Sequence, residues 1–94
     1  MKLATLFNLI TQRKEDLPTG SYTASLFRAG QARIRGKVAE ESQEVIQAAR
    51  FEDRTRLIEE SCDVLFHLFV LLVSQNVTLD DIEKELARRN KAKQ

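Results

Sequence analysis

Two short clusters of acidic residues in this sequence have the side chains and the spacing of a metal-binding site. Glu41 and Glu44 form an E-x-x-E pattern, and Glu60 and Asp63 form an E-x-x-D pattern after a spacer of residues 45–59. Residues three apart share one face of a helix, so antiparallel packing of two such helices would bring four carboxylates together. Carboxylates 4 Å apart repel by about 1 kcal/mol in water, and by more when partly buried, so a protein that keeps such a cluster normally has something that neutralises it. An all-oxygen ligand set suits a hard cation, and Mg²⁺ is the usual one with phosphate substrates.

The alternative interpretation is that these acids are ordinary solvated side chains on helix surfaces. Two features favour the metal site. Glu60 and Asp63 stand at the head of the most apolar stretch of the chain, which turns their face partly inward. The two clusters also lie on consecutive helices joined by a short loop, which makes them neighbours. Glu40, one turn before Glu44, lies near the same face and either supports the ligands from outside or pairs in solvent.

Three other residues near the acids have two interpretations each. Lys37, one turn before Glu41, forms an i, i+4 ion pair or reaches a phosphate oxygen of a substrate. His67, one turn after Asp63, is expected to be a hydrogen-bonded core or interface residue rather than a metal ligand, because imidazole is unusual among hard oxygen ligands. Cys62 has no neighbouring base, so we interpret it as a small packing residue rather than a reactive thiol.

Helical periodicity with clear start and stop signals predicts five helices that position these residues. Ser21 is expected to cap the second helix, Asp53 the fourth and Thr78 the fifth, with Asp81 completing a capping box. Gly30 is expected to end the second helix. The expected helices cover residues 2–14, 22–29, 31 or 32–49, 54–75 and a last helix from residue 79.

The fold class that follows is all-α, a single domain of residues 1–94 built as a bundle of four to five helices and completed by oligomerisation. The stripe expected to face inward on the third helix is Ile34, Val38, Glu41, Val45 and Ala48 or Ala49. A glutamate in the middle of an apolar stripe is anomalous and suggests that this helix is more than scaffold. Residues 64–73 are apolar on nearly all sides, and so short a chain can hardly cover them alone. We therefore expect a homodimer or tetramer.

The composition and charge of the chain limit the classes of partner that it is expected to bind. The chain is 43% hydrophobic and 31% charged with a net charge of +1, which gives no electrostatic case for binding nucleic acid or a membrane surface. A single cysteine fits a reducing compartment. The longest apolar run is well short of the roughly 20 residues that span a bilayer. We expect a cytoplasmic protein with a small-molecule partner.

Three segments carry a resemblance to a known family. Residues 21–27 read S-Y-T-A-S-L-F, residues 37–44 read K-V-A-E-E-S-Q-E, and residues 59–68 read E-E-S-C-D-V-L-F-H-L. The two acid pairs resemble the MazG-type all-α nucleotide pyrophosphohydrolase superfamily. Together with the S-Y-T segment, the chain resembles the phosphoribosyl-ATP pyrophosphohydrolase family of histidine biosynthesis over nearly its whole length. Phe66 stands where that family usually has tyrosine.

The resemblance implies a Mg²⁺-dependent enzyme that hydrolyses 1-(5-phosphoribosyl)-ATP to 1-(5-phosphoribosyl)-AMP and pyrophosphate. It implies Glu41, Glu44, Glu60 and Asp63 as the magnesium ligands. Either Glu40 or Glu44 would then be catalytic, by orienting or deprotonating the attacking water. The residues expected to bind substrate are Ser21, Tyr22, Thr23 and Lys37. The alternative for the first three is that they only cap the second helix.

Two other functions remain open on the sequence. A house-cleaning nucleoside triphosphate pyrophosphohydrolase of the same superfamily would carry the same four acids. A non-catalytic helical dimerisation module would leave these acids solvated. The segment from Ser21 to Gly30 is what separates the two enzymes, since it is the candidate recognition segment.

Overall fold

The computed structural model describes residues 1–93, with side chains to residue 90, and within that range every regular element is a helix. The five helices run in the expected order. They are α1 (Leu3–Asp16), α2 (Tyr22–Ala29), α3 (Gln31–Phe51), α4 (Arg54–Ser74) and α5 (Leu79–Lys93). The all-α fold class is therefore confirmed, with helix boundaries within two residues of those predicted.

The N-terminal part of the fold follows from local capping. The helix α1 ends at Asp16, two residues later than predicted, and Leu17 follows in the left-handed conformation with its N–H donating to the Arg13 carbonyl. The Ser21 hydroxyl accepts from the Ala24 N–H, which confirms the predicted cap of α2. Gly30 ends α2 at φ 96°, a conformation that favours glycine, and α3 begins at the next residue.

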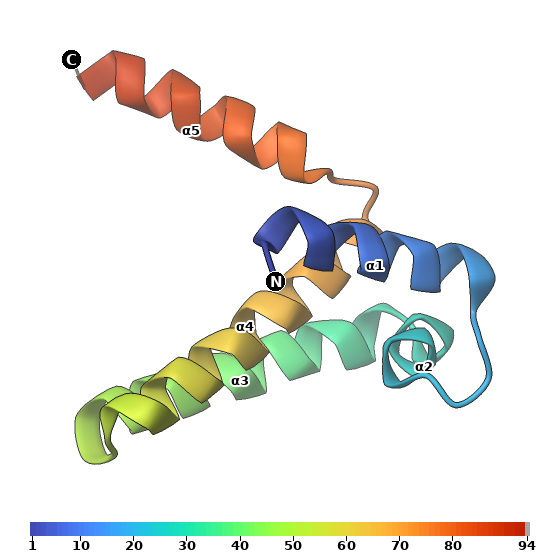
Figure 1. Cartoon of the computed structure of the whole chain (residues 1–94), viewed down its shortest axis with the longest axis horizontal. Coiled ribbons are helices and arrows are strands. Elements are labelled where there is room, and N and C mark those ends of the chain that lie inside the picture. Colours follow the sequence, from blue (N-terminus) through green and yellow to red (C-terminus); the bar gives the residue numbers. More distant parts are fainter. Residues whose placement is uncertain (94) are drawn as a thin grey trace.

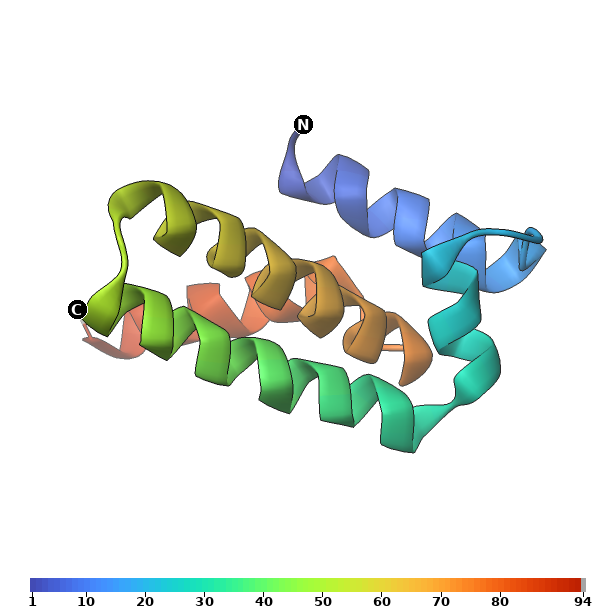
Figure 2. The ribbon, with the colours of Figure 1, turned by 90° about the horizontal axis from the view of Figure 1, so that it is seen from below.

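The helices α3 and α4 form a long antiparallel hairpin that carries both acidic clusters (Figure 2). The hairpin turn is tight because Asp53 caps α4 directly after α3 ends, its carboxylate accepting from the Arg56 N–H. At the other end of α4, Asn76 takes a positive φ and the chain leaves the helix. This hairpin is the element that makes the two acidic clusters neighbours, as predicted.

The hydrophobic core lies where α1 and α2 cross the α3–α4 hairpin. Phe7 of α1 meets Phe69 of α4 edge to face, with ring centroids 5.2 Å apart. The expected inward stripe of α3 is confirmed at Ile34, Glu41 and Ala48, which are buried, whereas Val38 and Val45 are only partly buried. The buried core cluster comprises Phe7, Ile10, Leu26, Ile34, Phe69, Val70 and Val73.

The last helix, α5, extends away from the other four (Figure 1). The predicted capping box starts it: Asp81 N–H donates to the Thr78 hydroxyl, and Thr78 N–H donates to the Asp81 carboxylate. Between α5, α4 and α1 runs an apolar groove of about 460 Å³. Its main lining residues are Leu3, Leu65, Leu68, Leu72, Ile82 and Leu86. No helix of the described chain combines the length and apolarity that crossing a membrane requires.

Candidate metal centre

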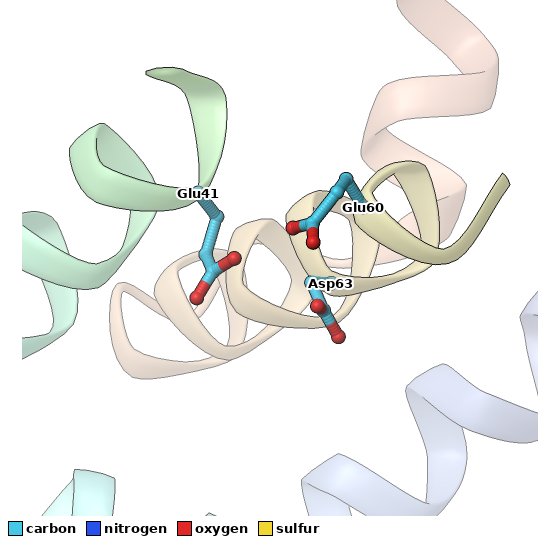
Figure 3. A group of neighbouring side chains, drawn as sticks. All are labelled: Glu41, Glu60 and Asp63. Atoms are coloured by element: carbon cyan, nitrogen blue, oxygen red, sulfur yellow. The ribbon is translucent and has the colours of Figure 1, made fainter. Parts of the chain in front are cut away.

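Three carboxylates from the two central helices meet at one point. Glu41 projects from α3 toward Glu60 and Asp63 on α4, as Figure 3 shows. One oxygen atom from each carboxylate can be chosen so that all three lie within 4.8 Å of one another. The antiparallel hairpin produces this arrangement, because it sets the middle of α3 beside the first half of α4. The structure thus brings together three of the four predicted metal ligands as a single group.

Two of these carboxylates are buried, and each has an oxygen without a partner. Glu41 is 6% exposed and Glu60 is 5% exposed. Among the described residues, no donor reaches Oε2 of Glu41 or Oε2 of Glu60. A buried carboxylate oxygen without a hydrogen bond costs free energy, so native proteins rarely leave one unpaired. Two such oxygens in one acidic cluster fit a site that holds a cation.

The other oxygen of each buried carboxylate pairs with a cationic side chain one helical turn earlier. Lys37 Nζ lies 3.2 Å from Oε1 of Glu41, and Arg56 pairs with Oε1 of Glu60. Sequence reasoning considered the Lys37 pair but missed Arg56, although the same i, i+4 spacing was visible. Each base fixes its carboxylate while leaving the second oxygen free. Arg56 also pairs with Glu59, so it is not committed to the cluster alone.

Glu44 joins the group through its electrostatics. A hydrogen bond to the Glu60 carboxyl and repulsion from Glu41 raise the pKa of Glu44 from 4.5 to about 7. Burial, followed by repulsion from Glu41 and Glu60, raises the pKa of Asp63 as well. Both shifts have the direction expected when several carboxylates crowd one volume without a cation. Glu44 is itself exposed and lies outside the group of three converging carboxylates, but it interacts with two of them, Glu41 and Glu60.

Glu40 lies outside this group. Its side chain is 56% exposed and pairs with Lys37 Nζ at 3.4 Å. Burial alone would lower the pKa of Lys37, but the hydrogen bond to Glu41 and the neighbouring negative charges outweigh it and the pKa is raised. Lys37 thus stays cationic at the edge of the acidic cluster. The predicted ion pair of Lys37 with Glu41 is therefore confirmed.

The predicted recognition segment lies beside the acids at the start of α2. Ser21 is occupied as the helix cap, while Tyr22 is half exposed and its hydroxyl lies 2.9 Å from His67 Nε2. His67 is buried and hydrogen-bonded, as expected. The interpretation of Cys62 as a packing residue is wrong for the single chain, because Cys62 is exposed. The helical stripe through Asp63 and His67 turns Cys62 outward.

Several features of the site decide what it can hold. The ligand atoms are all carboxylate oxygens, and two of them are buried and unpaired. Hard oxygen ligands favour Mg²⁺, Mn²⁺ or Ca²⁺ over softer transition metals. One side of the group is open, since Asp63 is exposed, so a bound cation would remain accessible to a phosphate. The donor set therefore fits a magnesium ion that shares its coordination with a phosphorylated ligand.

Comparison with known proteins gives a consistent result. Residues 3–90 match the sequence profile of a family described as phosphoribosyl-ATP pyrophosphohydrolase. A phosphoribosyl-ATP pyrophosphatase of Clostridium botulinum is 52% identical over 85 residues, which cover 90% of this chain and 77% of that protein. The protein of the same name from Leptospira biflexa is 48% identical, covering 94% and 96% of the two chains. The one from Metallosphaera sedula is 43% identical, covering 95% and 96%.

Proposed function

The chain belongs to the phosphoribosyl-ATP pyrophosphohydrolase family, and from that premise we propose that it hydrolyses 1-(5-phosphoribosyl)-ATP. The products are 1-(5-phosphoribosyl)-AMP and pyrophosphate, in the second step of histidine biosynthesis. One observation supports this site above all: two buried carboxylate oxygens, on Glu41 and Glu60, meet no donor among the described residues. Unpaired carboxylate oxygens are available to bind the metal ion that accompanies a triphosphate substrate.

Glu41, Glu44, Glu60 and Asp63 would hold magnesium. A bound Mg²⁺ supplies charge neutralisation on the phosphate oxygens during phosphoryl transfer. The α3–α4 hairpin sets the spacing of the ligands before any ligand arrives, because Lys37 and Arg56 each hold one carboxylate in place. This fixed arrangement is what catalysis by electrostatic stabilisation requires.

The attacking water would be oriented by Glu44 rather than by Glu40. Glu44 interacts with the carboxylates of Glu60 and Glu41, and an ionised carboxylate beside the proposed magnesium can accept a proton from a water molecule. Glu40 points to solvent and is engaged by Lys37. A water held by Glu44 would attack phosphorus at the bond between the α- and β-phosphates, and its proton would pass to the Glu44 carboxylate. The bridging P–O bond would break and pyrophosphate would leave.

Substrate would be held on the open side of the acids. Lys37 is a cation at this edge and carries only hydrogen-bond donors, which suits a phosphate oxygen. Tyr22 and Thr23 begin α2 next to it, and Ser21 precedes them as the cap. These four residues are the candidates for binding the phosphoribosyl-ATP.

We propose further that the functional unit is a homo-oligomer, a dimer or a pair of dimers. The groove along α4 exposes leucines that a lone chain leaves in water, among them Leu3, Leu68 and Leu86. The tip of the α3–α4 hairpin exposes a second apolar group, Ile46 and Phe51. Large apolar surfaces of this kind on a small chain are typical of interfaces. A second copy of the chain is the partner we assign to the groove.

The substrate can be tested by comparing two classes of nucleotide in one assay. Purified protein with excess Mg²⁺ is given phosphoribosyl-ATP, or in parallel a panel of canonical and modified nucleoside triphosphates, and pyrophosphate release is measured. We expect kcat/KM for phosphoribosyl-ATP to exceed that for every other nucleotide by at least about 100-fold, roughly 2.7 kcal/mol of transition-state discrimination. A preference for a modified triphosphate would instead support the house-cleaning function.

A further inference from the structure

The hydroxyl of Tyr22 forms a relay with His67 and the backbone of α4. Tyr22 Oη lies 2.9 Å from Nε2 of His67. The other ring nitrogen, Nδ1, lies 2.8 Å from the carbonyl oxygen of Asp63, one turn earlier on α4. The relay thus links the candidate recognition segment of α2 to the helix that carries two of the candidate metal ligands.

The direction of each hydrogen bond follows from what its atoms can do. A carbonyl oxygen only accepts, so Nδ1 of His67 must carry a proton and donate it to Asp63. In a neutral imidazole the second nitrogen then has a lone pair and no proton. In that neutral form Nε2 accepts, and the Tyr22 hydroxyl donates its only proton to it.

The relay is held rigidly by the surrounding rings. His67 is 6% exposed. The Phe66 ring stacks against the Tyr22 ring at 6.1 Å and 26°, and it meets His67 edge to face at 5.0 Å. Three aromatic rings in mutual contact leave the Tyr22 ring little freedom to rotate. Tyr22 itself is 49% exposed, so a ligand in solution can reach this side chain.

We propose that His67 is a positioning residue that makes the Tyr22 hydroxyl a hydrogen-bond acceptor toward the substrate, and that Tyr22 thereby selects a donor group on the nucleotide. With its proton committed to His67, the Tyr22 oxygen offers only lone pairs outward. A phosphate oxygen, itself an acceptor, is disfavoured there, whereas a ribosyl hydroxyl or an N–H is favoured. Lys37, which only donates, takes the phosphate. This inference rests on the proposed function, and it assigns different parts of the substrate to Tyr22 and to Lys37.

The proton arrangement can be measured directly in the unaltered protein. We would label the single histidine with ¹⁵N and record long-range ¹H–¹⁵N correlations at neutral pH without metal or substrate. The expected spectrum is that of a neutral ring protonated at Nδ1. A ring protonated at Nε2, or a doubly protonated ring, would leave the Tyr22 proton free to point outward and would overturn the proposal.

The consequence for substrate is tested with a set of matched variants. Tyr22→Phe removes only the accepting oxygen, so the KM for phosphoribosyl-ATP should rise roughly tenfold, the loss expected for one hydrogen bond, with kcat nearly unchanged. His67→Leu should raise KM to a similar extent, and the double variant should be no worse than either single one, because the two residues act as a unit. His67→Gln, whose amide oxygen can reach the position of Nε2, should recover most of the affinity. Thr11→Val, which removes a hydroxyl on α1 that bonds within its own helix, serves as the control and should leave KM as it is.

Two readouts separate this role from others. The affinity for Mg²⁺, measured by titration calorimetry without substrate, should be the same in Tyr22→Phe and in the unaltered chain. An unchanged KM in Tyr22→Phe, a weakened Mg²⁺ affinity, or strictly additive effects in the double variant would each overturn the proposal. If the unaltered protein released no pyrophosphate from phosphoribosyl-ATP, the proposed function would fail, whereas the tautomer spectrum would still decide the state of the relay.

Discussion

Glu41 on α3 and Glu60 on α4 are buried in the same way from opposite sides of the hairpin. One oxygen of each is held by a base one turn earlier, Lys37 or Arg56, and the other oxygen meets no donor among the described residues. Packing alone does not explain such a pair, because apolar residues of similar volume would avoid the cost of burying the charges. A cation between the two helices does explain it, and the following predictions depend on that cation.

Neutralising any one of the clustered acids should disable the enzyme without unfolding it. Glu41→Gln, Glu44→Gln and Asp63→Asn should each lower kcat by roughly 10²-fold or more, the usual loss when a preorganised electrostatic group is removed. Pyrophosphate release gives the rate, and far-ultraviolet circular dichroism should show unchanged helix content. Glu59→Gln is the matched control, because Glu59 neighbours Glu60 but is exposed. Near-normal rates in two of the three variants would rule out the cluster as the catalytic metal site.

Stability should depend on pH in a manner that metal abolishes. The folded chain keeps a proton on Glu44 up to about pH 7, whereas a glutamate in the unfolded chain loses it near 4.5. The folded state therefore binds more protons between these values, so the free energy of unfolding falls as the pH rises through this window. Asp63, whose pKa is also raised, acts in the same direction. In EDTA the melting temperature should fall from about pH 5 to pH 8.

Two additions sharpen that measurement. Glu44→Gln should flatten the fall in EDTA, because the repelled charge is gone, and millimolar Mg²⁺ should raise the melting temperature of the unaltered chain at pH 8 by mass action. The variant should gain less from Mg²⁺ because it has lost a ligand. A melting temperature that climbs with pH in EDTA would show that the acids are stabilised by their bases and carry no net repulsion.

Sequence reasoning reached most of this fold because its signals were local. Ser21, Asp53 and Thr78 are caps whose hydrogen bonds involve residues three positions away, so their effect is visible in a short window. The convergence of the acids could also be predicted from the sequence, because a tight turn at Asp53 makes two consecutive helices pack side by side. Contacts between residues far apart in the sequence could not be predicted in this way. The contact between Tyr22 and His67 joins residues 45 positions apart, and no spacing rule connects them.

Lys37 should contribute to binding of substrate and not merely to folding. Lys37→Met keeps the aliphatic stem and removes the charge, so KM for phosphoribosyl-ATP should rise by roughly tenfold if the ammonium contacts a phosphate. Lys84→Met, at an exposed ion pair on α5, is the control. If Lys37 served only to pair with Glu41, the variant would have a normal KM and a lower melting temperature in EDTA.

The apolar groove along α4 should be covered by a second copy of the chain. Replacing Leu68 by glutamate places a charge in the groove, and the expected result is aggregated or unfolded protein, because burial of the groove is needed for a stable fold. Gln12→Glu adds the same charge on the exposed side of α1 and should leave the oligomer intact. Sedimentation or light scattering gives the mass of each variant. A soluble, well-folded Leu68→Glu monomer would contradict the assignment.

The most direct test of the central claim is pyrophosphate release from phosphoribosyl-ATP as a function of free Mg²⁺, with the unaltered protein and Glu41→Gln side by side. We expect no release in EDTA, saturable activation of the unaltered protein by Mg²⁺, and little activity of Glu41→Gln at any concentration, since an amide replaces the buried carboxylate that has a free oxygen. Full turnover of the unaltered protein in EDTA, or equal activation of the two proteins by Mg²⁺, would contradict a catalytic magnesium site between α3 and α4.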